Sequence, residues 1–246
     1  MATAILIDGA FFLHRYRALM TESTQHNPED VASMMMRWAL SHLNQNDERR
    51  DLYRIFYYDC PPLDKKVTLP ISNTPFDFAE THEAQFRHGL FDELRRKRKL
   101  ALRLGYLADT GQWTIKPTVM RALLRGERQY NSLRDEDFAY DVRQKGVDIR
   151  IGQDIASLAY KKLADQIVLF AGDADFVPAA KLARREGIDF VLDPMWKSIP
   201  PELFEHIDGL RSTCPRPIRD GVGIGPANTL LPYPPNTSSY PPISSI

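Results

Sequence analysis

The segment QIVLFAGDADFVP, residues 166–178, constrains the possible folds of this chain more than any other stretch. Its apolar run 167–171 is too short for a helix and suits a strand that is buried on both faces. Gly172 then lets the backbone turn, and the proline that closes the segment suits the first turn of a helix. Asp173 and Asp175 are therefore predicted to lie at the carboxyl end of a buried strand, the edge where open parallel sheets bind ligands.

Two explanations are open for this pair of aspartates. As neighbours beside buried strands, the two carboxylates would repel each other and raise each other's pKa. A divalent cation would relieve that repulsion, and hard oxygen ligands suit Mg²⁺ or Mn²⁺. Alternatively, Asp175 caps the following helix and Asp173 closes a turn. The segment alone does not decide between them.

Other apolar strands in the chain also end in a carboxylate. Residues 4–8 lead into Asp8, residues 54–59 end in another aspartate, and a helical pattern lies between them. Strands alternate with helices almost throughout, which predicts an α/β fold with a mostly parallel sheet and helices on both faces. Asp8, Asp173 and Asp175 should then meet at one edge of that sheet.

One folded domain is predicted over residues 1–212. Leucines alternate with other residues over 100–104, and residues 113–116 are expected to return as the hairpin partner of that strand. The charged, weakly patterned stretch 109–144 is predicted to be an insertion that caps one side of the sheet.

The end of the chain, residues 213–246, differs in composition from the rest. It contains eight of the chain's 18 prolines, and no charged residue follows position 220. This composition predicts a disordered or polyproline-like tail. The segment 232–235 could dock in the aromatic groove of a protein partner, or it could belong to an unstructured end.

Composition narrows the class of protein. The chain is 43% hydrophobic but has no apolar run of membrane-spanning length and no signal peptide pattern, so we expect a soluble, cytoplasmic protein without a membrane partner. Its 32 basic and 32 acidic residues argue against coating nucleic acid through bulk charge, although a local basic groove remains compatible. Two cysteines and six histidines without ligand spacing predict neither a disulfide framework nor a zinc site.

A further pair of carboxylates lies on the helix predicted after Lys145. At 100° per residue, Asp148 and Asp154 fall on opposite flanks of its apolar stripe, so both can face the sheet, although Asp148 could simply be the N-cap. The sequence shows no serine or cysteine nucleophile with a histidine base and no glycine-rich phosphate loop. A cluster of carboxylates without histidine suits metal-assisted attack of water on a phosphodiester.

The motifs Ile7-Asp8-Gly9, Lys145-Gly-Val-Asp148 and Gly172-Asp-Ala-Asp-Phe176 together resemble the NYN (LabA-like) domain of the PIN-like nuclease superfamily, over roughly residues 3–195. The resemblance implies a PIN-like three-layer α/β/α fold with a mostly parallel five-stranded sheet. It also implies cleavage of RNA with Mg²⁺ or Mn²⁺ as cofactor.

The resemblance also implies roles for individual residues. By position, the catalytic and metal-binding cluster is Asp8, Asp148, Asp173 and Asp175. Asp154 matches a further metal-binding carboxylate, although it could be an ordinary residue at the edge of the apolar stripe. Lys145 could contact a phosphate of the substrate or simply be an exposed turn residue.

Two residues depart from the family pattern. Phe11 stands where many members have asparagine, and Ala171 stands where serine is frequent. The loss of polar groups near the site implies altered substrate handling or weaker catalysis, although no carboxylate is lost. A catalytically inactive PIN-like scaffold that binds RNA or a protein partner is therefore the alternative function.

A phosphatase of the haloacid dehalogenase type is a second rival, because Asp173-Ala-Asp175 after an apolar strand loosely fits its nucleophile motif. That family carries the motif on its first strand, and little foldable sequence follows Val177 here.

Overall fold

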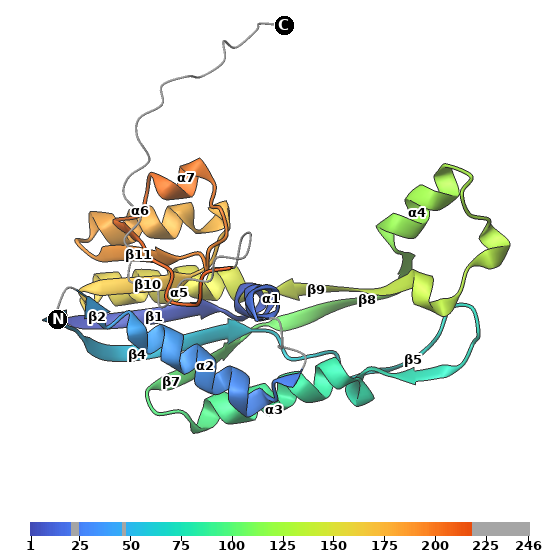
Figure 1. Ribbon diagram of the computed structural model, residues 1–246, viewed down its shortest axis with the longest axis horizontal. Coiled ribbons are helices and arrows are strands. Elements are labelled where there is room, and N and C mark those ends of the chain that lie inside the picture. The colour runs from blue at the N-terminus through green and yellow to red at the C-terminus, as the bar shows by residue number, and fades with distance from the viewer. Residues whose placement is uncertain (21–24, 46–47, 218–246) are drawn as a thin grey trace, which may run out of the picture.

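The computed structural model describes residues 1–20, 25–45 and 48–217 (Figure 1). The helices are α1 (Gly9–Leu19), α2 (Pro28–Ser41), α3 (His82–Arg96), α4 (Pro117–Leu124), α5 (Val147–Tyr160), α6 (Val177–Arg185) and α7 (Pro201–Phe204). The central strands are β1 (Ala2–Asp8), β4 (Asp51–Asp59), β7 (Leu100–Leu104), β10 (Gln166–Phe170), β11 (Asp189–Asp193) and β12 (Gly209–Leu210). Antiparallel pairs outside this sheet are β2 (Asn44–Gln45) with β3 (Glu48–Arg49), β5 (Lys66–Thr68) with β6 (Pro75–Asp77), and β8 (Tyr106–Ile115) with β9 (Phe138–Lys145).

The central sheet has six strands in the order β12-β11-β10-β1-β4-β7, and every neighbouring pair is parallel. The predicted mostly parallel α/β fold is therefore confirmed, with one more strand than the five that the resemblance implied. The additional strand, β12, pairs with β11 through only two residues, Gly209 and Leu210. A strand of that length carries no periodicity in the sequence, which explains why it was not predicted.

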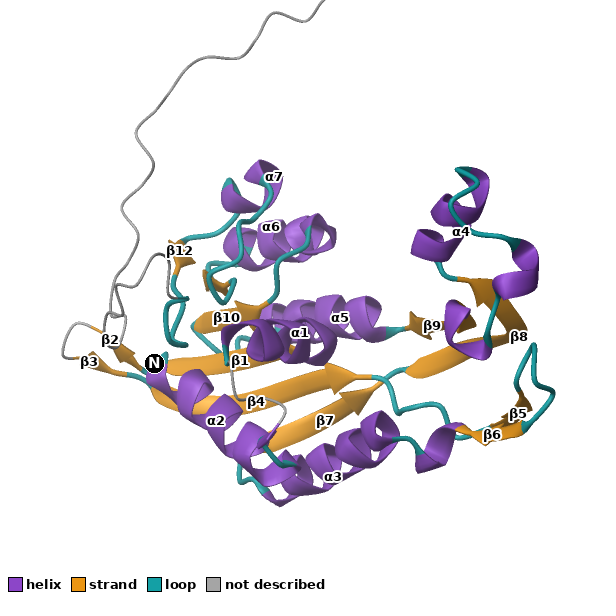
Figure 2. Cartoon of the chain, turned by 45° about the vertical axis from the view of Figure 1, so that its right-hand side comes forward, coloured by secondary structure: helices purple, strands orange, loops and turns teal. Residues whose placement is uncertain are grey.

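Side chains of β1 alternate between two cores on opposite faces of the sheet. Ala4 and Leu6 pack with α5, α6 and α7, whereas Ile5 and Ile7 pack with α1, α2 and α3. All four are fully buried, as the apolar run predicted. The result is a three-layer α/β/α body, with one group of helices on each side of the sheet (Figure 2).

The chain changes direction across the sheet at β1. From β1 it passes through α1 and α2 to β4 on one side, whereas β10, on the other side of β1, is followed by α6 and β11. The helix that follows β1 (α1) and the helix that follows β10 (α6) therefore lie on opposite faces of the sheet, which opens a crevice at the carboxyl ends of these two strands. The predicted strand-end site lies at this topological switch point.

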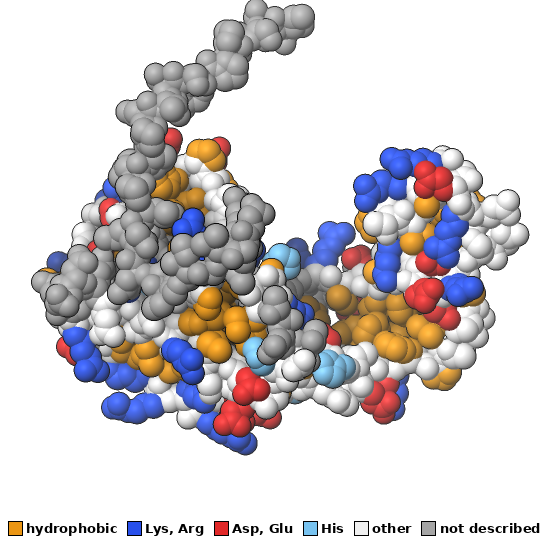
Figure 3. Space-filling model, in the orientation of Figure 1, with side chains coloured by type: hydrophobic (Ala, Val, Ile, Leu, Met, Phe, Trp, Pro, Cys, Tyr) orange, Lys and Arg blue, Asp and Glu red, His pale blue; other side chains and the backbone are white. Residues whose placement is uncertain are grey.

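Residues 106–145 form an arm that extends from the sheet and carries α4 near its end (Figure 1). Its two long strands, β8 and β9, pair with each other from Tyr106↔Lys145 to Ile115↔Phe138. The expected hairpin between residues 113–116 and 100–104 is thus wrong, because β7 is a parallel edge strand beside β4. Figure 3 shows the α4 end of the arm as a lobe separated from the body by a notch.

An aromatic cluster holds the β5–β6 pair against the arm. The ring of Phe78 stacks on Trp113 at 6.2 Å and lies 5.2 Å from Tyr140, and the Trp113 indole donates a hydrogen bond of 3.0 Å to the carbonyl of Thr68. These half-buried contacts stiffen the β8–β9 ribbon close to its α4 end, where Trp113 pairs with Tyr140.

The chain stays packed on the body as far as Cys214, which is fully buried. Most of the predicted tail, with its proposed partner-docking segment, lies outside the described residues. None of the helices that the structure describes is long and apolar enough to cross a membrane.

Candidate active site

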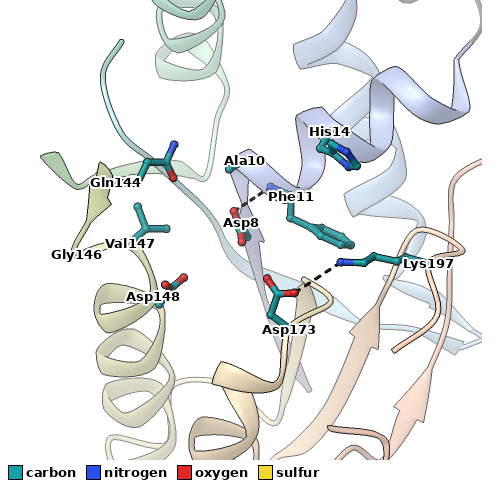
Figure 4. Close-up of a pocket in the computed structure, with 10 residues that line it drawn as sticks. All are labelled: Asp8, Ala10, Phe11, His14, Gln144, Gly146, Val147, Asp148, Asp173 and Lys197. Carbon is teal, nitrogen blue, oxygen red and sulfur yellow. Dashed lines mark hydrogen bonds and ion pairs between the residues drawn. The ribbon is translucent and has the colours of Figure 1, made fainter. Parts of the chain in front are cut away.

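A cavity of about 340 Å³ opens where β1, β10 and the start of α5 meet (Figure 4). Its walls are formed by Asp8, Ala10, Phe11, His14, Gln144, Gly146, Val147, Asp148, Asp173 and Lys197. Three of the four aspartates predicted for the cluster thus come together from distant parts of the chain. Figure 4 shows the carboxylates of Asp8, Asp148 and Asp173 directed into the same space.

Asp8 is the buried member of the group. It ends β1 and caps α1, and its Oδ1 accepts a hydrogen bond of 3.1 Å from the backbone N–H of Phe11. Only 8% of the residue is exposed, and this burial raises the pKa of Asp8 from 3.8 to about 6. Repulsion from Asp148 and Asp59 raises the pKa further, whereas the capping hydrogen bond opposes the shift.

Asp148 lies in the first turn of α5, on the opposite wall of the cavity. The helix N-cap is Gly146, whose φ of 80° suits glycine, so the interpretation of Asp148 as the N-cap is wrong. Burial raises the pKa of Asp148, and the charges of Asp175 and Asp173 raise it further. Asp175 does not line the cavity, but it is close enough to Asp148 for its negative charge to raise the pKa of Asp148.

Neither the Asp173 nor the Asp175 side chain makes a helix-capping hydrogen bond. Asp173 precedes a short 3₁₀ turn over residues 174–176 and accepts no capping hydrogen bond, and α6 begins after Phe176 without a side-chain cap. The Asp173 side chain is 62% exposed and faces the cavity. The alternative role of Asp175 as the cap of the following helix is therefore wrong, whereas Asp173 does stand at a turn, where its backbone carbonyl accepts a hydrogen bond of 3.5 Å from Phe176 N.

Asp154 and Lys145 do not line the cavity. Asp154 Oδ2 accepts hydrogen bonds from the Tyr58 hydroxyl at 2.8 Å and from Arg103 Nε at 3.1 Å, so this carboxylate already has two donors. Lys145 ends β9 with an exposed side chain, between two residues that do line the cavity. The roles predicted for both residues stay predictions.

Lys197 is a cavity residue that the motifs did not predict. Its Nζ lies 3.7 Å from Asp173 Oδ1 and 5.6 Å from the centre of the Phe11 ring. Lys197 follows the end of β11, so the strand-end rule that selected the aspartates also covers its position. Phe11, the departure from the family pattern, packs against Gly172, where an added Cβ would lie 2.8 Å from its ring.

The donor chemistry of the cavity fits a hard divalent cation. Its carboxylates offer oxygen ligands, and the raised pKa of Asp8 shows the unrelieved cost of gathering negative charge at a buried position. Within the described part of the chain, however, no three acidic, histidine or cysteine side chains are close enough to hold a metal ion together. Mg²⁺ commonly keeps several waters and binds through one or two carboxylates, and the cavity has room for those waters.

Comparison with known families agrees with this geometry. The family model described as "NYN domain" matches residues 71–208, more than half of the chain. The match begins after β1, so it includes Asp148, Asp173 and Asp175, whereas the fold adds Asp8 to the site. No curated protein and no solved structure matches the chain. NYN domains are generally ribonucleases and typically use divalent metals, and this chain belongs to the NYN domain family of PIN-like nucleases.

Proposed function

We propose that this protein is a metal-dependent ribonuclease that hydrolyses RNA phosphodiester bonds at the cavity between β1, β10 and α5. The observation that carries the proposal is the convergence of Asp8, Asp148 and Asp173 on one cavity, where burial and mutual repulsion raise the pKa of the first two. A protein gains nothing in stability from such a cluster, so a functional ligand is its best explanation.

Asp8, Asp148 and Asp173 would hold Mg²⁺ or Mn²⁺, directly or through water, with Asp175 adding negative charge beside them. Bound there, the ion would neutralise charge on the phosphate and lower the pKa of the attacking water. In the hydrolysis, the water oxygen forms a new bond to phosphorus, an ester P–O bond breaks, and the leaving oxygen takes up a proton.

The burial or exposure of each aspartate indicates its role in the reaction. Asp8 is rigidly placed, because it is buried and hydrogen-bonded to the start of α1. Asp173, whose side chain is 62% exposed, accepts a hydrogen bond from the attacking water and orients it. Gly146 and Gln144, at the junction of β9 and α5, form the wall through which the arm borders the substrate.

The test is cleavage of a labelled single-stranded RNA by the purified full-length chain with Mn²⁺. We expect cleavage by the wild type, loss of cleavage in Asp173→Asn, and an unchanged unfolding midpoint in that variant, because Asp173 makes no capping bond. The matched control is Asp64→Asn, at an exposed position, which should cleave like the wild type. Equal activity in wild type and Asp173→Asn would refute the assignment.

A non-catalytic scaffold is the second candidate, and one observation favours it. No three ligands in the described residues are placed to hold a cation without rearrangement, and the Phe11 ring forms one wall of the cavity. This candidate predicts RNA binding without cleavage in either Mg²⁺ or Mn²⁺.

A further inference from the structure

The turn after β11, residues 193–197, has a backbone conformation that few side chains adopt. Met195 and Trp196 have φ angles of 47° and 63°, in the left-handed region that favours glycine. Two successive residues with side chains stay in this region only where their surroundings hold them there, and such places are concentrated at functional sites.

Hydrogen bonds hold the turn from several sides. Asp193 Oδ1 accepts from Met195 N (2.8 Å), Arg15 Nη2 donates to the Met195 carbonyl (2.7 Å), Ser212 Oγ accepts from Trp196 N (3.0 Å), and Trp196 Nε1 donates to the Cys214 carbonyl (3.0 Å). The turn is closed by a bond of 2.8 Å from Lys197 N to the Pro194 carbonyl. Contacts from α1, β11 and the segment after β12 thus fix the backbone from which the Lys197 side chain extends.

Asp193 anchors this arrangement in the core. Its side chain is fully buried, and its Oδ2 contacts His42 Nε2 at 2.8 Å and accepts a hydrogen bond of 3.2 Å from Thr213 Oγ1. The turn is therefore tied to the buried core of the α/β body through Asp193.

The side chain that this turn delivers points into the cavity. Lys197 is 43% exposed, and its Nζ lies beside Asp173 and over the Phe11 ring (Figure 4). The 3.7 Å separation from Asp173 is longer than a hydrogen bond, and Nζ donates no hydrogen bond to any residue in the described ranges. An exposed ion pair of this length is weak, so the three N–H donors of the ammonium group can bind another acceptor.

We infer that Lys197 binds a phosphate group of the RNA at the mouth of the cavity, held in place by the turn 193–197. The inference deepens the proposed function, since it names the chain's own contact to that substrate. A lysine suits the role as a compact positive charge with several donors. The Phe11 ring beneath it keeps the ammonium near the cavity while leaving its outer side open to the phosphate.

The experiment measures binding of a fluorescein-labelled single-stranded RNA to the full-length protein by fluorescence anisotropy, in EDTA so that the RNA stays intact. Wild type, Lys197→Met, Lys197→Arg and the control Lys161→Met are titrated over a range of KCl concentrations. Lys161 is exposed and follows the far end of α5, roughly 20 Å from the cavity by helix length. Lys161→Met therefore removes one positive charge from the protein without changing the cavity.

Loss of one phosphate contact on a single strand should reduce the salt slope of log K by about 0.7, which is about fivefold in affinity at 0.1 M salt. We expect the smaller salt slope and the weaker binding in Lys197→Met, and a slope and affinity close to those of the wild type in Lys197→Arg and Lys161→Met. The unfolding midpoints should be equal in all four proteins. A purely structural role would leave the salt slope unaltered.

Equal slopes in Lys197→Met and wild type would overturn the inference, and so would an equal loss in Lys161→Met. If the wild type cleaves RNA in Mn²⁺ but its slope does not depend on Lys197, the nuclease proposal stands alone. If the slope depends on Lys197 but no cleavage occurs, the contact stands and the nuclease proposal falls. Absence of RNA binding by the wild type would overturn both.

Discussion

Replacing Asp8 by asparagine should stabilise the protein at neutral pH. Burial holds the pKa of Asp8 at about 6, compared with 3.8 for the ordinary carboxyl group. Each pKa unit corresponds to about 1.4 kcal/mol, so keeping Asp8 ionised in the folded state costs up to about 3 kcal/mol. Asparagine caps helices about as well as aspartate, so the bond from Phe11 N should survive the replacement.

The sign of the pH dependence follows from proton binding. Between pH 4 and pH 6 the folded state keeps the proton on Asp8 while the unfolded state loses it, so the folded wild type is destabilised as pH rises. Below pH 4 both states are protonated, and wild type and Asp8→Asn should be about equally stable. Above pH 6 the variant should be more stable by about 1–3 kcal/mol.

Urea unfolding in EDTA at several values between pH 4 and pH 7.5 measures this difference directly. The control is Asp64→Asn, an exposed replacement that should give a pH-independent difference near zero. Added Mn²⁺ should stabilise the wild type and close part of the gap, because only the wild type has the full set of carboxylates. A variant that is equally or less stable than wild type at pH 7 would show that the charge of Asp8 is not an energetic burden, and the reasoning would fail.

Three further replacements separate structural from functional groups. Asp154→Asn should lower the unfolding midpoint slightly but keep more than half of the RNA cleavage rate, and loss of cleavage would restore Asp154 to the metal site. Gly172→Ala should lower the free energy of unfolding by about 1–3 kcal/mol, because the added Cβ clashes with the Phe11 ring. In a double-mutant cycle, Gly172→Ala should cost less stability when Phe11 is already replaced by alanine, and additive effects would contradict the contact. Arg87→Met should lower the free energy of unfolding in urea by about 3–5 kcal/mol, because it leaves the fully buried Asp59 carboxylate without its ion-pair partner. The double variant Arg87→Met/Asp59→Asn should recover part of this loss, and a single variant as stable as the wild type would refute the reasoning.

The strand-end rule accounts for most of what the sequence predicted correctly. Apolar runs over β1 and β10 are buried on both faces, so their lengths and ends are readable without a structure. Parallel pairing then brings Asp8 and Asp173 to the same edge. Asp148 joins them because α5 starts at that edge, a position which the resemblance suggested and the fold explains. Their part in metal binding stays a prediction.

The arm could not be predicted in the same way. Its strands β8 and β9 are mostly exposed or half-buried, so they lack the alternation that identifies a strand packed on a core. Pairing of Tyr106 with Lys145 joins residues separated by the whole of the arm. Local pattern therefore led to the wrong hairpin partner, since the stabilising contacts, such as the stack of Trp113 on Phe78, come from a distant segment.

The strand-end rule covers the position of Lys197, but the direction of its side chain depends on a backbone conformation that the sequence does not announce. A glycine would have signalled the left-handed turn, but Met195 and Trp196 occupy it instead, at a cost of about 1–3 kcal/mol each. Glycine would relieve that strain but would lose the buried Met195 side chain and the Trp196 hydrogen bond to Cys214. The side chains that make the turn costly are thus the ones that fix it to the core. The backbone of Lys197 is thus held firmly while its ammonium group stays available at the cavity, which is the arrangement that the proposed phosphate contact needs.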